Sequence, residues 1–277
     1  MKVHVLFTNR FNPEEISEIE LKNCICAVID TIRATSTIAT MLGCGGNSII
    51  VAGSKSEAFK LKKVFSEYIL CGEEGGVAPE GFDYDNSPLE ISRIDCTGMD
   101  FILMTTNGTR SIFKVKECRE VFAISLLNLN YTIDCMVDCA LKDSSDILIL
   151  CSGIKGEVSY DDTFNAGLCI KYMLKKPYKF EFTDSSKLVL SAALSEFDIT
   201  GALEKSTSAK LLRLVSTGDD ISFLSHLNKY RVAPRLNKIN IREVKPENIS
   251  AKELKSYLGY DTIYVLKKGS HCLQEPK

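Results

Sequence analysis

Short apolar runs alternate with segments of helical period over most of the chain. Runs rich in β-branched and apolar residues predict strands. The predicted strands are residues 3–7, 24–29, 48–51, 101–104, 121–124 and 147–151. Because helical segments separate these strands, the pattern predicts βα units, and therefore an α/β fold with a largely parallel sheet.

Apolar stripes at helical spacing predict several core-facing helices. The first spans residues 54–68 and begins with a capping box formed by Ser54 and Glu57. Two further stripes cover residues 133–141 and 190–197. Beyond about residue 175, helices dominate up to residue 230.

The C-terminal part ends in a different pattern. An alternating run covers residues 237–244, a second capping box stands at Ser250 and Glu253, and a late strand is predicted at residues 262–266. The chain is predicted to form a single domain over residues 1–277. The alternative is a division into two lobes around a cleft, at about residues 1–175 and 176–277.

The composition is that of an ordinary globular protein, with 45% apolar and 25% charged residues. The net charge is −2 and no run of five or six like charges occurs, so neither a nucleic acid nor an anionic membrane is expected as a partner. No apolar run approaches the roughly 18 residues of a membrane span. The 11 cysteines favour reduced thiols, so we expect a cytoplasmic protein.

Polar residues collect where three of the predicted strands end. The stretch IDTIRATST, residues 29–37, follows the first of these strands and places Thr35 or Ser36 as the N-cap of the next helix. A helix N-terminus binds anions, and Arg33 would add a bidentate fork for phosphate or carboxylate. The alternative is that the hydroxyls only cap the helix and that Arg33 pairs with Asp30.

The second junction is FILMTTNGTR, residues 101–110. It supplies, in order, Thr105, Thr106, Asn107, Gly108, Thr109 and Arg110. Gly108 permits close approach of a ligand or a positive φ. The stretch is either a second anion cradle or an ordinary Asn-Gly turn.

The third junction is ILILCSGIKGEVSYDD, residues 147–162. Two glycines, Lys155, Glu157, Asp161 and Asp162 precede a predicted helix at residues 163–174. The acids either cap this helix or supply a carboxylate to a metal. Since ligands of open parallel sheets bind beyond the carboxyl ends of the strands, we expect the three loops to converge.

Between the first two junctions, the loop CGEEGGVAPEGFDYDNSPLE, residues 71–90, contains six acids and no clear period. Long loops of this kind are often functional. Oxygen ligands suit a hard cation such as Mg²⁺, and the candidates here are Glu73, Asp83, Asp85 and Asn86. The sequence has no C-x-x-C pair and its three histidines are far apart, so no His/Cys metal cluster competes.

The motifs of several phosphate chemistries are missing from the sequence. It has no G-x-x-x-x-G-K-[ST] and no G-x-G-x-x-G after a strand, which excludes nucleotide binding by those devices. The usual cysteine, histidine and paired-aspartate phosphatase signatures are absent too, and so is the G-x-S-x-G elbow.

Taken together, the junctions resemble the 2-phosphosulfolactate phosphatase family. The matching stretches, over about residues 24–172, are VIDTIRATSTIATML, CGEEGGVAPEGFDYDNSPLE, MTTNGTRSI, SLLN and CSGIKGEVSYDDTFNAGLCI. The resemblance implies a layered α/β/α fold with a mixed sheet. It also implies Mg²⁺-dependent hydrolysis of the phosphate ester of 2-phosphosulfolactate, a step toward coenzyme M.

The resemblance and the junctions give one set of candidate residues. The candidate catalytic residues are Asp30, Arg33, Asp83, Asn107 and Asp161, with Asp83 or Asp161 as acid or base. The candidate substrate-binding residues are Thr35, Ser36, Asn86, Ser87, Thr106, Gly108, Thr109, Arg110 and Lys155. The candidate Mg²⁺ ligands are Asp30, Glu73 and Asp83. A metal-activated water is the simplest nucleophile, and a covalent route through Thr or Ser is the alternative.

Two positions depart from the family pattern: Glu74 stands where an arginine is expected, and Asp85 where a glycine is expected. Acids there would weaken the attraction for an anionic substrate. The alternative substrate is therefore another small phosphorylated hydroxy acid, and the alternative function is a non-catalytic anion-binding module. The expected partner is the small anionic substrate, and a homodimer is considered as the assembly.

Overall fold

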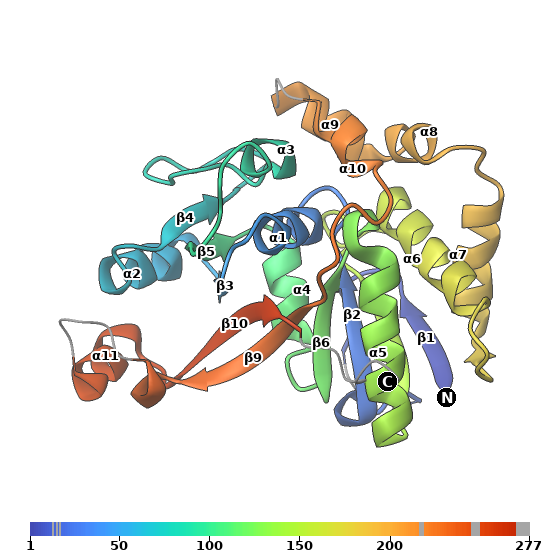
Figure 1. The fold of residues 1–277 in the computed structure, drawn as a ribbon, viewed down its shortest axis with the longest axis horizontal. Helices are drawn as coiled ribbons and strands as arrows, with labels where there is room; N and C mark the ends of the chain where they lie inside the picture. The colour runs from blue at the N-terminus through green and yellow to red at the C-terminus, as the bar shows by residue number, and fades with distance from the viewer. Residues whose placement is uncertain (13, 15, 17, 216–218, 245–249, 270–277) are drawn as a thin grey trace.

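The computed structural model describes residues 1–12, 14, 16, 18–215, 219–244 and 250–269. Helices flank one large mixed sheet, which confirms the α/β fold (Figure 1). The strands are β1 (Lys2–Leu6), β2 (Cys24–Ile29), β3 (Ser48–Ala52), β4 (Ile69–Gly72), β5 (Asp100–Met104), β6 (Glu120–Ile124), β7 (Asp146–Cys151), β8 (Glu181–Phe182), β9 (Pro234–Asn240) and β10 (Thr262–Lys268). All six strands predicted in the first 151 residues are found, within two residues at each end, and β4 was not predicted.

The helices lie between and around these strands. The α-helices are α1 (Ala34–Gly43), α2 (Lys55–Val64), α3 (Pro88–Ile91), α4 (Gly108–Lys114), α5 (Leu129–Asp143), α6 (Tyr160–Met173), α7 (Asp184–Leu194), α8 (Ile199–Glu204), α9 (Thr207–Val215), α10 (Asp220–Leu224) and α11 (Ala251–Leu258). Three short 3₁₀ helices are η1 (Leu21–Asn23), η2 (Leu126–Asn128) and η3 (Ile241–Glu243).

The sheet consists of two parallel sections joined by an antiparallel pair. Its order is β4-β5-β3-β10-β9-β6-β2-β7-β1-β8, and the first three strands and the last five form the parallel sections. β10 pairs antiparallel with β3 and with β9, and β9 pairs antiparallel with β6. In Figure 1, β9 and β10 run diagonally between the two sections.

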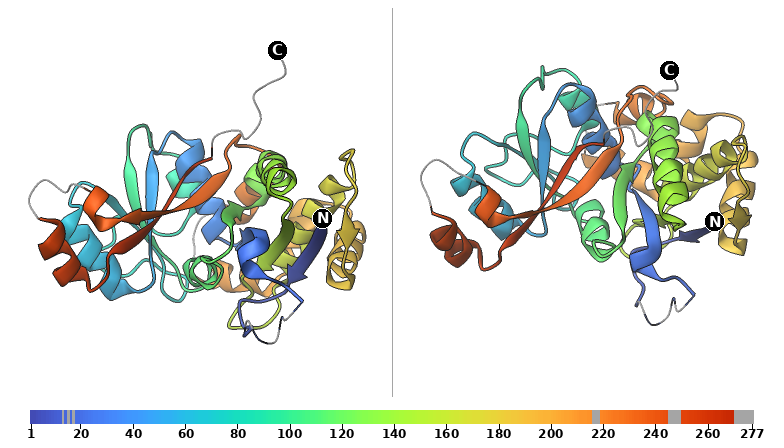
Figure 2. Two further views of the ribbon diagram at one scale, coloured as in Figure 1. Left: turned by 90° about the horizontal axis from the view of Figure 1, so that it is seen from below. Right: turned by 60° about the horizontal axis from the view of Figure 1, so that its bottom comes forward.

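The two sections share one hydrophobic core around α1 and α4. In this core, Val28 of β2 and Leu103 of β5 belong to the same cluster as Met41 of α1 and Ile112 of α4. The outer face of the larger section is covered by α5 and α6, and the outer face of the smaller one by α2 and α11. Figure 2 shows these helices on opposite sides of the molecule. Folding both sections around the same helices brings their strand ends together.

The two predicted capping boxes form to different extents. At α11 both hydrogen bonds of the box form, since Glu253 N donates to Ser250 Oγ and Ser250 N donates to the Glu253 carboxylate. At α2, Ser54 accepts from Glu57 N at 3.2 Å, but the Glu57 carboxylate accepts instead from Gly53 N and from Tyr260 Oη. This acid thus ties α2 to the C-terminal part of the chain.

Residues beyond 175 add to the same sheet as those before it: β8 lies at one edge, and β9 and β10 lie in the middle. The division into lobes stays a prediction. The ten cysteines in the described part of the chain are in the thiol form, and all except Cys44 are buried. In that same part, no helix is both long and apolar enough to cross a membrane.

Candidate active site

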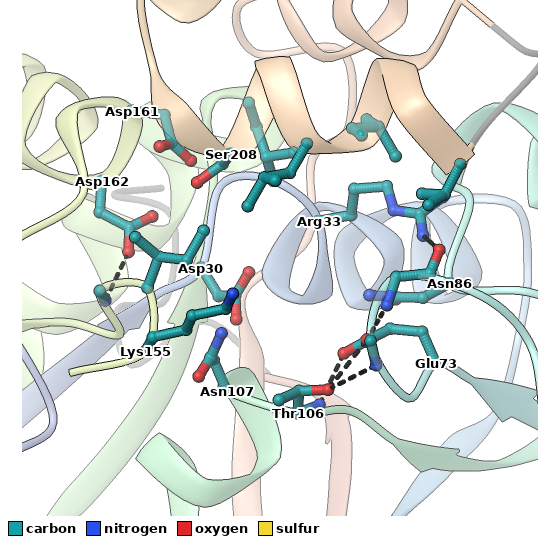
Figure 3. A pocket seen from close by; sticks show the side chains of 18 of the residues that line it. Asp30, Arg33, Glu73, Asn86, Thr106, Asn107, Lys155, Asp161, Asp162 and Ser208 are labelled. Carbon is teal, nitrogen blue, oxygen red and sulfur yellow. Dashed lines mark hydrogen bonds between the residues drawn. The ribbon is translucent and has the colours of Figure 1, made fainter. Parts of the chain in front are cut away.

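A cavity of about 290 Å³ lies where the chain leaves β2, β4, β5 and β7 (Figure 3). Its polar lining consists of Asp30, Arg33, Glu73, Asn86, Thr106, Asn107, Lys155, Asp161, Asp162 and Ser208, together with the glycines 75, 76 and 153. All three polar junctions of the sequence therefore reach one cavity, as expected from the sheet.

Asp30 stands at the end of β2 and is 8% exposed. Its Oδ1 accepts a hydrogen bond of 3.2 Å from Ala34 N, so this carboxylate caps α1. Gly108 approaches it from α4: a Cβ on Gly108 would lie 2.4 Å from Ala34 Cβ and 3.0 Å from Asp30 Oδ2. The glycine is needed here for close approach between two helices, not for a positive φ.

The hydroxyls after Asp30 point into the protein interior. The expected N-cap at Thr35 or Ser36 is wrong, because α1 begins at Ala34 and these side chains lie inside its first turn. Thr35 Oγ1 donates to Asp30 O at 2.9 Å and accepts from Asp30 N at 3.1 Å. Ser36 Oγ donates 2.8 Å to a backbone carbonyl of the turn before the helix. Both residues are fully buried, so they hold the turn that presents Asp30.

Arg33 is 4% exposed and binds carboxylates of the protein itself. Its Nη1 donates to Asp85 Oδ2 at 2.9 Å and to Asp220 Oδ2 at 3.1 Å. Its Nη2 donates to Gly76 O at 3.1 Å and to Asp85 Oδ1 at 3.4 Å. Arg33 therefore pairs with Asp85 and Asp220, and not with Asp30 as considered from the sequence. Its guanidinium is already bound to groups of the protein.

Glu73 connects the ends of β4 and β5. Its Oε1 accepts from Thr106 N at 2.6 Å, and its Oε2 accepts from Thr106 Oγ1 at 2.9 Å and from Gly76 N at 2.8 Å. Charge-assisted hydrogen bonds of this kind hold a carboxylate in one orientation. Glu73 is thereby fixed at the edge of the cavity, and it is 9% exposed.

Two adjacent acids at the start of α6 complete the polar wall. Asp162 accepts from Thr31 N at 2.8 Å and from Gly153 N at 3.0 Å, so it links the first junction to the third. Asp161 accepts a short hydrogen bond from Ser159 Oγ. Ser159 is in turn 2.9 Å from Ser208 Oγ, which connects this acid to α9.

Crowded, buried carboxylates raise one another's pKa. Burial raises the pKa of Asp30 to about 7, repulsion from Glu73 and Asp161 adds to this, and the Ala34 N–H and Arg33 oppose it. Burial also raises the pKa of Asp161, against its hydrogen bonds from serine hydroxyls. A cation in the cavity would relieve this repulsion.

The donors facing the cavity are oxygens, as a hard cation requires. In addition, the Oδ1 atom of Asn86 is buried and accepts no hydrogen bond from the described residues. In those residues, no group of three His, Cys, Asp or Glu side chains is arranged as a metal cluster. Mg²⁺ commonly takes one or two carboxylates and completes its shell with waters and substrate oxygens, and the cavity fits this mode.

Comparison with known proteins agrees with the geometry. The sequence model of 2-phosphosulpholactate phosphatase matches residues 10–238. The chain belongs to the 2-phosphosulfolactate phosphatase family. A protein of Carboxydothermus hydrogenoformans named "Probable 2-phosphosulfolactate phosphatase" is 34% identical over 234 residues, which cover 84% of this chain and 92% of that one. A protein of Pseudothermotoga lettingae with the same name is 32% identical over 226 residues, which cover 81% of this chain and 92% of that one.

Two of the site residues expected from the family pattern lie outside the cavity lining. Asp83 accepts from Leu70 N at 2.8 Å, and its carboxylate is 3.4 Å from Lys62 Nζ, so it braces β4. Arg110 is exposed on α4. Glu74, one of the two departures from the family pattern, is also exposed and does not line the cavity.

Two more expected substrate-binding residues are buried structural groups. Ser87 caps α3 and donates to Asp220 Oδ1 at 2.7 Å. Thr109 Oγ1 donates to Thr105 O at 2.8 Å. Both side chains hold the loops of this family site in place without facing the cavity.

Lys155 is exposed and forms no ion pair with the described residues. Its φ of 51° places the backbone in the left-handed region. In Figure 3, its side chain extends toward Asp30, beside Asn107. Lys155 is therefore the cation of the lining that is available to a ligand.

Sequence reasoning missed one entire wall of the site. Helix α9 contributes Ser208, Leu211, Leu212, Leu214 and Val215 to the cavity lining. Figure 3 shows this helix crossing the cavity on the side opposite Thr106. No polar motif at a strand end indicates that α9 belongs to the site, because this helix lies far along the chain from the strands that carry those motifs. The only sequence signal is its leucine content.

Proposed function

We propose that the protein is a Mg²⁺-dependent phosphatase that hydrolyses the phosphate ester of a small 2-hydroxy acid, with 2-phosphosulfolactate as the reference substrate. The observation that carries the proposal is the convergence of Asp30, Glu73, Asp161 and Lys155 on one cavity. Family membership supports the class of reaction, since the relatives' names describe phosphatases of 2-phosphosulfolactate. Removal of phosphate from an ester needs little from the protein beyond positioning and electrostatics.

In this proposal, Asp30 and Glu73 are the residues that would hold the cation. Bound Mg²⁺ supplies charge neutralisation at the phosphoryl oxygens. Lys155 adds a second positive charge on the open side, where it extends toward Asp30. Asn107 lines the cavity at the N-terminus of α4, and its side chain makes no capping bond there, which leaves the amide free to donate to a phosphoryl oxygen.

Asp161 is the candidate acid. Burial raises its pKa and favours the protonated form. Water adds to phosphorus, the P–O ester bond breaks, and the leaving alkoxide takes the proton of Asp161. The proton released by the attacking water restores the acid. The hydroxyls of Thr35, Ser36 and Thr109 donate to backbone carbonyls, which argues against a covalent route through them.

The occupied Arg33 favours a second candidate function. An arginine neutralised by Asp85 and Asp220 contributes little to stabilising the charge that develops as a phosphate ester reacts, and a module that binds its ligand without catalysis needs no such stabilisation. The two are separated by phosphate release from a panel of phosphorylated 2-hydroxy acids, with and without Mg²⁺. Mg²⁺-dependent release supports the phosphatase. Thermal stabilisation by the same compounds without release supports the binding module.

The remaining expectations stay predictions. They are a cytoplasmic location, a place on the route to coenzyme M, a homodimer, and the absence of a nucleic-acid partner.

A further inference from the structure

The cavity has an apolar side that the proposed chemistry does not use. Its apolar lining among the described residues consists of Ile32, Ile154, Leu211, Leu212, Leu214 and Val215. Leu212 is 6% exposed and packs into the core, but Leu211 is 38%, Val215 is 45% and Leu214 is 79% exposed. Core packing therefore does not account for these three side chains.

This apolar wall is held in a defined position against the polar one. Ser208 Oγ of α9 lies 2.9 Å from Ser159 Oγ, and Ser159 also donates to the carboxylate of Asp161. At the other end of α9, a Cβ on Gly76 would lie 3.1 Å from Val215 Cγ2. The same Gly76 accepts a hydrogen bond from Arg33. Both ends of the wall are thus in contact with polar parts of the site.

The cavity has few positive charges with which to neutralise the anionic groups of a substrate. The acids of the lining are Asp30, Glu73, Asp161 and Asp162, and its cations are Arg33 and Lys155. Arg33 already binds two carboxylates. Lys155 and one divalent cation can neutralise a phosphate and assist a carboxylate. On the α9 side of the cavity, a third anionic group such as a sulfonate would lie against leucines, and a charged group on an apolar surface loses hydration without compensation.

From this arrangement we propose that the cavity selects phosphorylated 2-hydroxy acids carrying an apolar side chain in the place where sulfolactate carries its sulfonate. The proposal rests on the proposed phosphatase function and specifies its substrate class. An aliphatic or aromatic group would cover Leu211, Leu214 and Val215 and remove their surface from water. Leu211 and Leu214 then determine specificity, whereas Asp30 and Lys155 serve every ester.

The test compares the phosphate esters of four acids that differ in one group: lactate, 2-hydroxy-4-methylpentanoate, 3-phenyllactate and sulfolactate. We expect kcat/KM to increase by about tenfold or more from the lactate ester to the 3-phenyllactate ester, and to be lowest for the sulfolactate ester. A Leu211→Ser/Leu214→Ser variant should lower the ratio of kcat/KM for the 3-phenyllactate ester to kcat/KM for the lactate ester by about tenfold.

The matched control is Leu188→Ser/Leu194→Ser, which removes two leucines that are 63% and 58% exposed on α7 and do not line the cavity. It should behave as wild type with all four esters. Equal thermal midpoints of the two variants would show that both fold. A preference for the sulfolactate ester, or an equal loss with every ester in the Leu211/Leu214 variant, would overturn the proposal.

Binding separates this proposal from the proposed function. Benzylphosphonate and phosphonoacetate cannot be hydrolysed, so calorimetry with Mg²⁺ measures their affinity whether or not the protein is a phosphatase. We expect benzylphosphonate to bind at least about tenfold more tightly than phosphonoacetate, and to lose this advantage in the Leu211/Leu214 variant. If phosphate is released from none of the esters, the proposed phosphatase function is contradicted, but the proposed apolar specificity is not. Equal binding of the two phosphonates would overturn the apolar specificity.

Discussion

Arg33 and Asp85 form a forked ion pair, with Nη1 2.9 Å from Oδ2 and Nη2 3.4 Å from Oδ1. Asp85 stands where the family pattern led us to expect a glycine. Without this carboxylate, one side of the guanidinium would face the cavity while Asp220 still bound Nη1. The residue at position 85 therefore controls how much positive charge the site offers to its ligand.

Replacement of Asp85 by glycine should strengthen binding of anionic substrates. With Asp85→Gly we expect the KM for 2-phosphosulfolactate to fall by about tenfold, because a charge-assisted hydrogen bond to the substrate is worth ~1.5–3 kcal/mol. Asp85→Asn, which keeps the side-chain shape, should give a smaller decrease. The control is Glu80→Gln, which removes the same charge from an exposed position of the same loop. A KM that does not change in either Asp85 variant would show that Arg33 does not reach the substrate.

Lysine should not replace Arg33. A single ammonium cannot make the four hydrogen bonds of the guanidinium, and Asp220 is fully buried. Breaking a buried pair typically costs ~3–5 kcal/mol, so Arg33→Lys should lower the free energy of unfolding by about this amount. Urea denaturation measures the loss, and Lys62→Arg at a half-exposed pair serves as the reference substitution. Wild-type stability in Arg33→Lys would contradict the bracing role assigned to the fork.

A methyl group at position 108 should disturb Asp30. The added Cβ would lie 2.4 Å from Ala34 Cβ, a distance at which α1 and α4 must move apart. We expect Gly108→Ala to lower the thermal midpoint by several degrees, since overpacking typically costs ~1–3 kcal/mol. Addition of Ala34→Gly removes the closest clash and should restore part of the loss. Failure of the double variant to recover any stability would show that the contact with Ala34 is not the cause.

The stability of the protein should depend on the charge of Asp30. Its pKa is raised from 3.8 to about 7 in the folded state, so its contribution to stability is fully present below pH 4 and is lost as pH rises through about 7. In a chelating buffer, Asp30→Asn should therefore match wild type near pH 4 and exceed it at pH 8, by on the order of a few kcal/mol. Thermal unfolding across this range measures the difference, with exposed Asp184→Asn as the control.

Addition of Mg²⁺ at pH 8 should stabilise wild type more than Asp30→Asn, because the cation binds the ionised carboxylate. If Asp30→Asn is no more stable than wild type at pH 8 in the chelating buffer, the ionised Asp30 carboxylate is not repelled by the neighbouring carboxylates.

The sequence predicted most of the strands and three of the cavity's loops, because buried β-branched runs and polar strand ends have strong local patterns. It did not predict which hydroxyls face the ligand. Thr35 lies in the first turn of α1 and donates to Asp30 O, whereas Thr106 lies between β5 and α4 and binds Glu73 at the cavity edge. That choice depends on tertiary neighbours and not on the residue type.

Long-range partners were equally beyond prediction. Asp220 is 187 positions from Arg33 and binds it because α10 packs against α3, a contact that no local period reveals. Asp83 shows the converse, since its motif matched the family but its carboxylate accepts a hydrogen bond from Leu70 N outside the cavity lining. The expected convergence of the loops at the carboxyl ends of parallel strands was confirmed, but the sequence did not show that the two parallel sections meet by folding around α1 and α4.

The most direct measurement is the release of phosphate from the phosphorylated 2-hydroxy acids by wild type and by Asp30→Asn, each with Mg²⁺ and with a chelator. We predict release by wild type that requires Mg²⁺, and a decrease in kcat of about 100-fold or more in Asp30→Asn with unchanged circular dichroism. Turnover near the wild-type rate in a folded Asp30→Asn variant, or release that does not depend on Mg²⁺, would contradict the proposed function of the cavity.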